Sequence, residues 1–253
     1  MSQRVLITAG ASGIGSTTAL AFAARGDRVH VCDVGRDALA AFAAAHPEIG
    51  TSVCDVADEA QVAALFADAL ARLGGLDFLV NNAGIAGPTA PVEAVDYADW
   101  RRCLLVNLDG AFLCARAAAP LLKAQRGGAI VNLSSTAGLY GFRNRTPYCA
   151  AKWGVIGLTK TLATELGPFG VRVNAICPGS VEGERMDRVV AAAAAASGAT
   201  PEAVRAEFVA SAAMGCFVRA EDIAATILFL CSPAGERISG QAIPVDGHTI
   251  SAS

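Results

Sequence analysis

The sequence predicts an α/β fold, with a doubly wound, seven-stranded parallel sheet flanked by helices in a single domain. Short apolar runs alternate with helical patterns along almost all of the 253 residues. Most of these runs are nearly continuous hydrophobes, which is typical of parallel strands covered on both faces. No linker, repeat or change of composition marks a second domain. Repeated β-α-β order with right-handed crossovers then gives an open, Rossmann-type sheet.

Each predicted strand is a run of four or five residues, three in one case. The seven runs cover residues 4–8, 28–32, 50–54, 78–80, 129–133, 172–175 and 242–245. Between them lie stretches rich in alanine and leucine with helical periodicity. These predicted helices cover residues 13–25, 36–45, 58–73, 98–125, 147–166 and 220–231.

Residues 180–216 break the alternation of strands and helices. A helical stretch there contains six consecutive alanines at 191–196 and is followed by Ser-Gly-Ala-Thr-Pro. Thr200 before Pro201 predicts a helix N-cap with proline at the first helical position. We expect a small helical insertion between two strands, serving as a lid over the substrate.

Composition and charge exclude several classes of protein. Apolar residues make up 53% and charged residues 17%, which provides for a large core and argues against disorder. The formal net charge of −3, with scattered Lys and Arg, argues against nucleic acid or an anionic membrane as a partner. Polar residues interrupt every apolar stretch and a strand pattern begins at once. We therefore expect no membrane span, no signal peptide and a cytoplasmic location.

Eight cysteines are spread singly along the chain. Their spacing fits neither disulfides nor zinc, and several fall inside apolar patterns, so they are interpreted as small buried hydrophobes in a reducing compartment. The three histidines, His30, His46 and His248, lack metal-ligand spacing, and no metal site is predicted. Cys149 stays open as a nucleophile, although no histidine is close to it in sequence.

A glycine-rich turn follows the first predicted strand and opens the first helix. It reads Thr8-Ala9-Gly10-Ala11-Ser12-Gly13-Ile14-Gly15. Glycines there let the backbone approach a pyrophosphate, whose charge is favoured at a helix N-terminus. Asp33, eighteen residues beyond Gly15, can accept hydrogen bonds from both ribose hydroxyls and would repel a 2′-phosphate, which favours NAD over NADP. Arg36 leaves NADP open, and a ligand-free turn and a strand-end cap are the structural alternatives.

Asn81-Asn82-Ala83-Gly84 closes the fourth predicted strand, at the edge where the ligand crevice of such a sheet forms. Its amides can brace the sheet, and its small residues leave room for a ribose. Taken alone, the motif would be interpreted as an ordinary turn.

Tyr148 and Lys152 lie four residues apart in a predicted helix, which places them on one face. An ammonium group about 5 Å away, at an effective dielectric constant of about 20, favours the phenolate by roughly 3 kcal/mol, or about two pKa units. This brings the pKa of Tyr148 towards the range that an acid/base catalyst needs. Ser135 lies thirteen residues upstream. A solvated lysine beside a helix-face tyrosine is the alternative.

In their joint order, these motifs resemble the classical short-chain dehydrogenase/reductase family from Val5 to about Gly247. Thr8 to Gly15 is similar to the family's Thr-Gly-x-x-x-Gly-x-Gly turn. The resemblance implies a catalytic set of Asn107, Ser135, Tyr148 and Lys152. It also implies cofactor contacts from Gly10, Ser12, Gly13, Ile14, Gly15, Asp33, Asp55, Val56, Asn82, Ala83, Gly84, Tyr148, Lys152, Pro178, Gly179 and Val181.

Two positions depart from the family pattern. Ala9 stands where the first glycine of the turn is usual, so the phosphate turn is expected to be shifted or to tolerate one methyl group. Gly183 stands where a threonine usually contacts the cofactor's carboxamide, and that contact would pass to Ser180 or to the backbone. Both departures concern cofactor affinity rather than the catalytic set.

The reaction that the resemblance implies is hydride transfer between nicotinamide and a carbinol carbon. Tyr148 would accept the alcohol proton as phenolate, Lys152 would lower the pKa of Tyr148 and bind the ribose, and Ser135 would donate to the substrate oxygen. Asn107 would position a water that connects Lys152 to solvent. The cofactor carries the redox chemistry, and the protein supplies orientation and electrostatics.

Four arginines flank the predicted substrate region: Arg143, Arg145, Arg185 and Arg188. Because guanidinium groups bind oxyanions bidentately, they suggest a substrate with a carboxylate, phosphate or sulfonate. Solvated arginines, or salt bridges between subunits, are the alternative and the simpler interpretation.

The function expected from the sequence is NAD-dependent oxidation of a secondary alcohol, polyol or hydroxy acid. An NADPH-dependent carbonyl or 3-oxoacyl reductase is the first alternative. A sugar-nucleotide epimerase or dehydratase on the same fold, and a non-enzymatic NAD(H) sensor or scaffold, are the others. The resemblance also implies a homotetramer.

Overall fold

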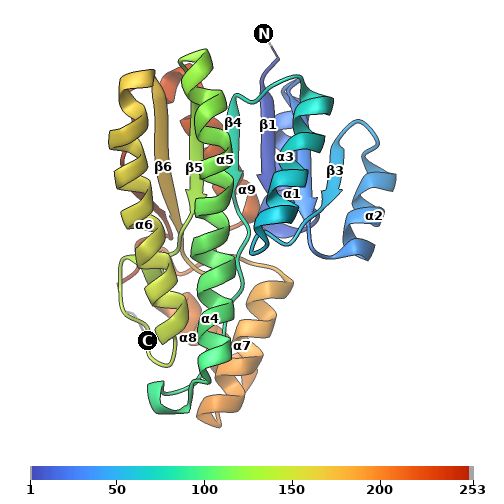
Figure 1. Cartoon of the computed structure of the whole chain (residues 1–253). Coiled ribbons are helices and arrows are strands. Elements are labelled where there is room, and N and C mark those ends of the chain that lie inside the picture. The colour runs from blue at the N-terminus through green and yellow to red at the C-terminus, as the bar shows by residue number, and fades with distance from the viewer. Residues whose placement is uncertain (1, 251–253) are drawn as a thin grey trace.

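Seven parallel strands form one sheet with the order β3-β2-β1-β4-β5-β6-β7, as the apolar runs predict (Figure 1). The computed structural model describes residues 2–250. The strands are β1 (Arg4–Thr8), β2 (Arg28–Asp33), β3 (Gly50–Val53), β4 (Phe78–Asn81), β5 (Gly128–Leu133), β6 (Val171–Pro178) and β7 (Ala242–Val245). The order reverses between β1 and β4, so a crevice is expected where their carboxyl ends diverge.

Strand β6 is longer than predicted, because it continues through Pro178 instead of ending at residue 175. Its last four residues pair in register with the whole of β7, from Ala175 opposite Ala242 to Pro178 opposite Val245. Proline, which has no N–H to donate, is tolerated at such a strand end. The longer strand carries the chain to the edge where the site forms.

Helices cover both faces of the sheet. The face formed by Val5 and Ile7 packs against α1 (Gly13–Ala24), α2 (Arg36–Ala45) and α9 (Ala220–Leu230). The face formed by Leu6 packs against α3 (Glu59–Leu73), α5 (Gly110–Gln125) and α6 (Thr146–Leu166). Alternate residues of one strand thus enter opposite layers, which is why the buried strands are hydrophobic throughout. Short 3₁₀ turns lie at Val92–Ala94, Thr136–Gly138, Gly167–Phe169 and Pro233–Gly235.

The predicted helix 98–125 is continuous but not uniform. It consists of α4 (Tyr97–Leu104), a π-helical segment (Leu105–Asp109) and α5. By length and composition alone, Tyr97–Gln125 is apolar enough to cross a membrane. However, Cys114, Ala118 and Leu122 are buried against the sheet. Part of the apolar surface of this helix is therefore buried as one layer of the core.

The helical insertion forms two helices, α7 (Glu184–Ser197) and α8 (Pro201–Ala210), below the carboxyl ends of the strands in Figure 1. Thr200 caps α8 as predicted, with its Oγ1 accepting a hydrogen bond of 3.2 Å from the backbone N–H of Ala203. The two helices share a small apolar cluster of Val190, Ala194 and Val204.

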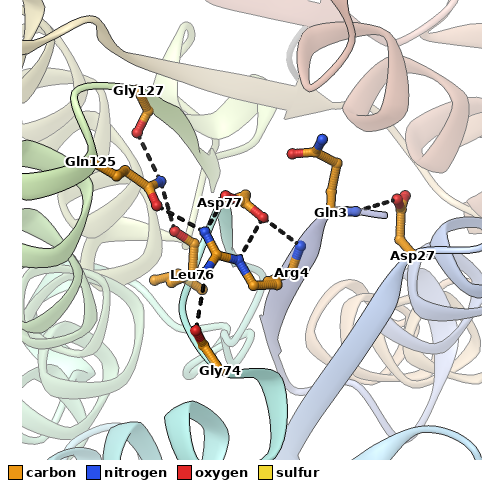
Figure 2. Close-up of polar contacts among 8 residues, drawn as sticks. All are labelled: Gln3, Arg4, Asp27, Gly74, Leu76, Asp77, Gln125 and Gly127. Carbon is orange, nitrogen blue, oxygen red and sulfur yellow. Dashed lines mark hydrogen bonds and ion pairs between the residues drawn. The ribbon is translucent and has the colours of Figure 1, made fainter. Parts of the chain in front are cut away.

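The opposite edge of the sheet is fastened by a polar cluster around Arg4 (Figure 2). The Arg4 side chain donates to Asp77 through Nε at 2.9 Å and Nη2 at 2.7 Å, and the Arg4 backbone N–H donates to the same carboxylate at 2.8 Å. Arg4 also donates to Gln125 Oε1 at 2.9 Å. These bonds tie the amino ends of β1 and β4 to the end of α5, so this ion pair lies at the edge away from the crevice.

Candidate active site

The glycine-rich turn joins β1 to α1 through two residues in the left-handed region, Ala9 at φ 51° and Gly13 at φ 53°. A Cβ atom on Gly10 would lie 2.5 Å from Cβ of Val31, and one on Gly15 would collide with the Ala9 carbonyl. Gly10 and Gly15 are therefore required by close packing. The alanine that departs from the family pattern carries a conformation that ordinarily favours glycine.

The N-terminus of α1 is open for an anion. Ser12 occupies the N-cap position without a side-chain cap, and the first turn contains no acidic residue. The free N–H groups and the helix dipole there fit a pyrophosphate. Asp33 lies beside this turn and accepts hydrogen bonds from the N–H groups of Ala11 at 3.2 Å and Gly35 at 3.0 Å. The residues present therefore fit a dinucleotide along the ends of β1 and β2.

The end of β4 is bound to the same turn. Asn82 Nδ2 donates to the carbonyls of Thr8 at 3.1 Å and Ala9 at 3.0 Å. Thr8 Oγ1 accepts from the N–H groups of Asn82 and Ala83, each at 3.0 Å. Thr8 is a residue whose bracing role the sequence did not reveal. The turn is thus held rigidly against two strands.

Asp55 and Val56, the pair expected beside the adenine, follow β3. The Asp55 carboxylate pairs with Arg102 at 3.0 Å and also accepts from the N–H of Ala57 at 3.0 Å. Val56 is buried against Gly110. Both residues lie at the carboxyl edge of the sheet, with Asp55 held towards α4.

Lys152 and Asn107 meet beside Gly84. Lys152 is buried and its Nζ donates to the carbonyl of Leu133, the last residue of β5, at 2.8 Å. Asn107 Nδ2 donates to the carbonyls of Ile85 at 3.0 Å and Cys103 at 2.9 Å. A Cβ atom on Gly84 would lie 2.6 Å from Asn107 Oδ1 and 3.3 Å from Lys152 Nζ. Glycine thus keeps open the space between these two atoms.

Asn107 Oδ1 is one of three buried polar side-chain atoms in residues 2–250 that have no hydrogen-bond partner. Such an atom demands a donor, because an unpaired buried carbonyl costs free energy. A water in the space beside Gly84 would provide that donor and would also contact Lys152. The arrangement fits the relay water expected from the family resemblance.

Tyr148 lies half-buried in the first turn of α6, with Lys152 Nζ at 5.6 Å from the centre of its ring. Burial opposes ionisation of this phenol. Nevertheless Arg185, Lys152, the Ser135 hydroxyl and Arg145 together hold the pKa of Tyr148 below its usual value. Burial also lowers the pKa of Lys152, while Tyr148 opposes this shift. The lysine is thus fixed in place as one of several cations around the phenol.

Two of the four predicted arginines reach Tyr148. Arg145, the N-cap residue of α6, has its guanidinium carbon 5.0 Å from the ring centre. Arg185, in the first turn of α7, lies 6.0 Å from the ring centre and its Nη2 is 3.4 Å from Tyr148 Oη. Arg188 instead pairs with Glu184 at 3.7 Å. Arg143 is exposed, and no contact with Tyr148 is found for it among the described residues.

The far side of the site is formed where β6 ends. Gly179 donates its N–H to Val245 at 3.0 Å, and a Cβ atom on it would lie 2.9 Å from Cα of Asp246. Val181 forms an isolated bridge with Val218. Gly183 has φ 124° at the N-cap of α7, a conformation that threonine would not adopt without strain. The backbone conformation at position 183 therefore favours the glycine that departs from the family pattern.

A narrow hollow opens between this segment and the helical insertion. It is lined by residues that include Thr136, Phe142, Ser180 and Phe208. Thr136 directly follows Ser135, so the hollow begins one residue from the serine. Neither Tyr148 nor Arg185 is among the residues that line it.

Among the cysteines, Cys103 contacts the site, because Asn107 Nδ2 donates to its carbonyl at 2.9 Å and lies 3.4 Å from its Sγ. Six of the eight are buried, Cys149 is half-buried and Cys216 is exposed, so the interpretation of all as buried hydrophobes was wrong for Cys216. His30, bonded to Ser52 at 2.8 Å in the core, is not placed to activate Cys149. No group of three or more His, Cys, Asp or Glu suited to a metal ion is found within residues 2–250.

The family model described as enoyl-(acyl carrier protein) reductase matches residues 8–248. The chain belongs to the short-chain dehydrogenase/reductase family and is an oxidoreductase, which confirms the family and the fold expected from the sequence.

Several relatives are similar over nearly their whole length. Cis-4-hydroxycyclohexanecarboxylate dehydrogenase of Sinomonas cyclohexanicum is 40% identical, over 97% of this chain and 96% of the relative. The 3-oxoacyl-[acyl-carrier-protein] reductase of Thermotoga maritima is 37% identical, with the same two coverages of 97% and 96%.

Solved structures agree with the fold. The solved structure of levodione reductase superposes with a TM-score of 0.92 at 35% identity, covering 97% of this chain and 96% of that structure. A levodione reductase from Leifsonia aquatica is also one of the sequence relatives. NAD⁺-bound xylitol dehydrogenase superposes with a TM-score of 0.93 at 31% identity, covering 97% and 98%.

Proposed function

We propose that this protein is an NAD-dependent dehydrogenase that oxidises a secondary alcohol, a polyol or a hydroxy acid, with Tyr148 as the acid/base. The observation that carries the proposal is the environment of Tyr148. Three cations near its ring and the Ser135 hydroxyl lower its pKa in spite of burial. A phenol with a lowered pKa is suited to accept a proton from an alcohol.

In the proposed reaction, the substrate hydroxyl lies between Tyr148 and Ser135. Tyr148 takes the hydroxyl proton as phenolate, while the Ser135 hydroxyl donates to the same oxygen and stabilises charge that develops there. The proton then leaves by way of Lys152 and a water held by Asn107 Oδ1, the buried atom that lacks a partner. A bound nicotinamide supplies the acceptor for the hydride.

The preference for NAD rests on Asp33. Its carboxylate is held beside the glycine-rich turn by two backbone N–H groups. In that position it would accept from the adenosine ribose and repel a 2′-phosphate. The relationship to NAD⁺-bound xylitol dehydrogenase supports this assignment. The relationship to a 3-oxoacyl reductase supports the alternative, a reductase of carbonyl substrates that uses NADPH.

A panel of matched alcohols tests the activity. Cyclohexanol, threitol, 4-hydroxycyclohexanecarboxylate and 4-hydroxycyclohexanecarboxamide would each be offered with NAD and with NADP, and reduced cofactor followed by absorbance. We expect kcat/KM to be higher with NAD than with NADP. In an Asp33→Asn variant this preference should shrink or reverse, because the repulsion of the 2′-phosphate is removed. A native preference for NADP would favour the reductase alternative.

The role of Tyr148 is tested by Tyr148→Phe, which removes one oxygen and keeps the ring. We expect the variant to retain NADH binding, measured by fluorescence titration, and to lose turnover by roughly 100- to 10,000-fold. Near-normal turnover would contradict the proposal. NADH binding by the wild type, without turnover on a broad panel in either direction, would favour the sensor or scaffold alternative.

We also propose the homotetramer and the cytoplasmic location that the family resemblance implies, and the lid role of α7 and α8. Light scattering on the purified protein tests the first, and fractionation of the source cells tests the second. Slower proteolysis within residues 180–216 when NADH and a substrate analogue are both bound would support the third.

A further inference from the structure

Three cationic side chains surround the ring of Tyr148, and they come from separate positions in the fold. Arg145 precedes α6, Lys152 lies one turn into α6, and Arg185 comes across from α7. Their charged groups lie 5.0, 5.6 and 6.0 Å from the ring centre, respectively. Even when Tyr148 is a phenolate, this cluster retains a surplus of positive charge.

No carboxylate pairs with either arginine within the part of the chain that the structure describes. Arg145 is held by two neutral acceptors, Thr89 Oγ1 and the carbonyl of Ala86, each at 3.0 Å. Burial lowers the pKa of Arg145, Tyr148 opposes this shift and the nearby Arg185 adds to it. Cations placed together in this way are ordinarily accompanied by an anion.

Three acidic residues near the start of α7 are already paired with other arginines. Arg205 pairs with Asp187 at 2.8 Å and with Glu182 at 3.9 Å. Glu184 pairs with Arg188 at 3.7 Å. The two arginines of α7 therefore differ in their partners. Arg188 pairs with a glutamate of its own helix, whereas Arg185 is directed to the catalytic tyrosine.

Resting on the proposed function, we propose that Arg185, assisted by Arg145, binds a carboxylate of the substrate and makes the enzyme selective for hydroxy acids. A guanidinium group presents two parallel N–H donors that match a carboxylate, and it remains charged throughout the working pH range. Arg185 is exposed, so an entering substrate can reach its guanidinium group. Arg145 is held in place by its hydrogen bonds and contributes mainly a positive electrostatic potential.

The geometry limits the size of the acid. The reacting hydroxyl must lie one hydrogen bond from Tyr148 Oη, and the carboxylate one hydrogen bond from Arg185 Nη2, which is 3.4 Å from that Oη. The hydroxyl and carboxylate oxygens are then at most about 9 Å apart. This admits acids whose carboxylate is several bonds from the carbinol carbon and excludes long-chain acids bound in an extended form.

The proposal is tested with 4-hydroxycyclohexanecarboxylate and 4-hydroxycyclohexanecarboxamide, the acid and the amide, which differ by one charge. We expect the wild type to prefer the acid in kcat/KM. Because Arg185 also lowers the pKa of Tyr148, Arg185→Ala should slow the turnover of both substrates at a fixed pH. It should reduce kcat/KM for the acid by roughly 10- to 100-fold more than for the amide, as expected for loss of a charge-assisted hydrogen bond. Arg188→Ala, which removes the same side chain three residues further along α7, is the matched control and should keep the preference.

Other results would overturn the inference in distinguishable ways. Equal turnover of acid and amide by the wild type would refute it, while the proposed dehydrogenase activity would stand. An equal loss for both substrates in Arg185→Ala, with the pH profile moved to higher pH, would mean that Arg185 acts only on the pKa of Tyr148.

A binding measurement covers the case in which no panel alcohol is turned over, which would count against the proposed function itself. Cyclohexanecarboxylate and cyclohexanecarboxamide, which lack the reacting hydroxyl, would be titrated into NADH-saturated protein by calorimetry. Tighter binding of the carboxylate that is lost in Arg185→Ala and kept in Arg188→Ala would support the anion site. Equal binding of the two compounds would refute it.

Discussion

Ala9 offers a direct measurement of strain in the cofactor-binding turn. At φ 51° it adopts the left-handed conformation, which costs an L-residue about 1–2 kcal/mol relative to glycine. Glycine in exchange adds about 0.4–1 kcal/mol of conformational entropy to the unfolded chain. Ala9→Gly should therefore raise the free energy of unfolding by about 1 kcal/mol, or the midpoint temperature by about 2–4 °C in a chain of this size.

Gly13 supplies the reverse substitution in the same turn. It has φ 53°, and a Cβ atom built on it meets nothing within 4 Å. Gly13→Ala should thus lose about 1 kcal/mol from backbone strain alone, without a steric clash. Urea unfolding of the cofactor-free protein, followed by circular dichroism, measures both changes. An unchanged or lower stability for Ala9→Gly, together with a neutral Gly13→Ala, would refute the reasoning.

Further predictions concern buried polar groups. Burial lowers the pKa of His30 from 6.5 to about 4, so the unfolded chain binds a proton at a higher pH than the folded chain does. The free energy of unfolding should therefore fall by roughly 3 kcal/mol between pH 6.5 and 4. Unfolding midpoints of the wild type and of His30→Asn, measured across that range, test this. Hydrogen bonds from Arg4 hold the pKa of Asp77 low in spite of burial, so their contribution persists above the unfolded pKa and is lost on acidification. Asp77→Asn should cost about 1 kcal/mol at pH 7 in this partly solvated pair, and progressively less as the pH falls through the lowered pKa of Asp77. Asn107→Ala should slow turnover by at least about tenfold and leave NADH affinity within about twofold; a lower NADH affinity with normal turnover would oppose the relay role.

The sheet was predictable because burial on both faces leaves a local signature. Runs such as Val5-Leu6-Ile7 are hydrophobic at every position, and their boundaries agree with the structure to within two residues. The extension of β6 through Pro178 was not visible, since it depends on pairing with β7, about seventy residues later. Proline and cysteine at the end of the run gave no local indication of that partner.

The site was predictable where spacing along one element decides position. Tyr148 and Lys152 share a helical face, and the glycine-rich turn must follow β1. The contact of Arg185 with Tyr148 was not decidable from sequence, because it depends on how α7 lies over the end of β6. Arg185 and Arg188 were equivalent in the sequence, and only the fold distinguishes them. Similarly, the sequence alone did not show how the turn accommodates Ala9 in place of glycine, and the structure shows that Ala9 adopts the left-handed conformation.

The π-helical segment Leu105–Asp109 has a consequence for insertions and deletions. Gly110 donates its N–H to the carbonyl of Leu105, five residues back, so this stretch carries more residues per turn than the helices on either side. Removing one residue would allow an α-helix from 97 to 125 without the π-helical segment, in which Pro120 alone still lacks an N–H to donate. It would also turn α4 and α5 by about 100° relative to each other. A one-residue deletion could thus produce a more regular helix in which Asn107 no longer faces Lys152, so this segment constrains the length of the chain as well as its composition.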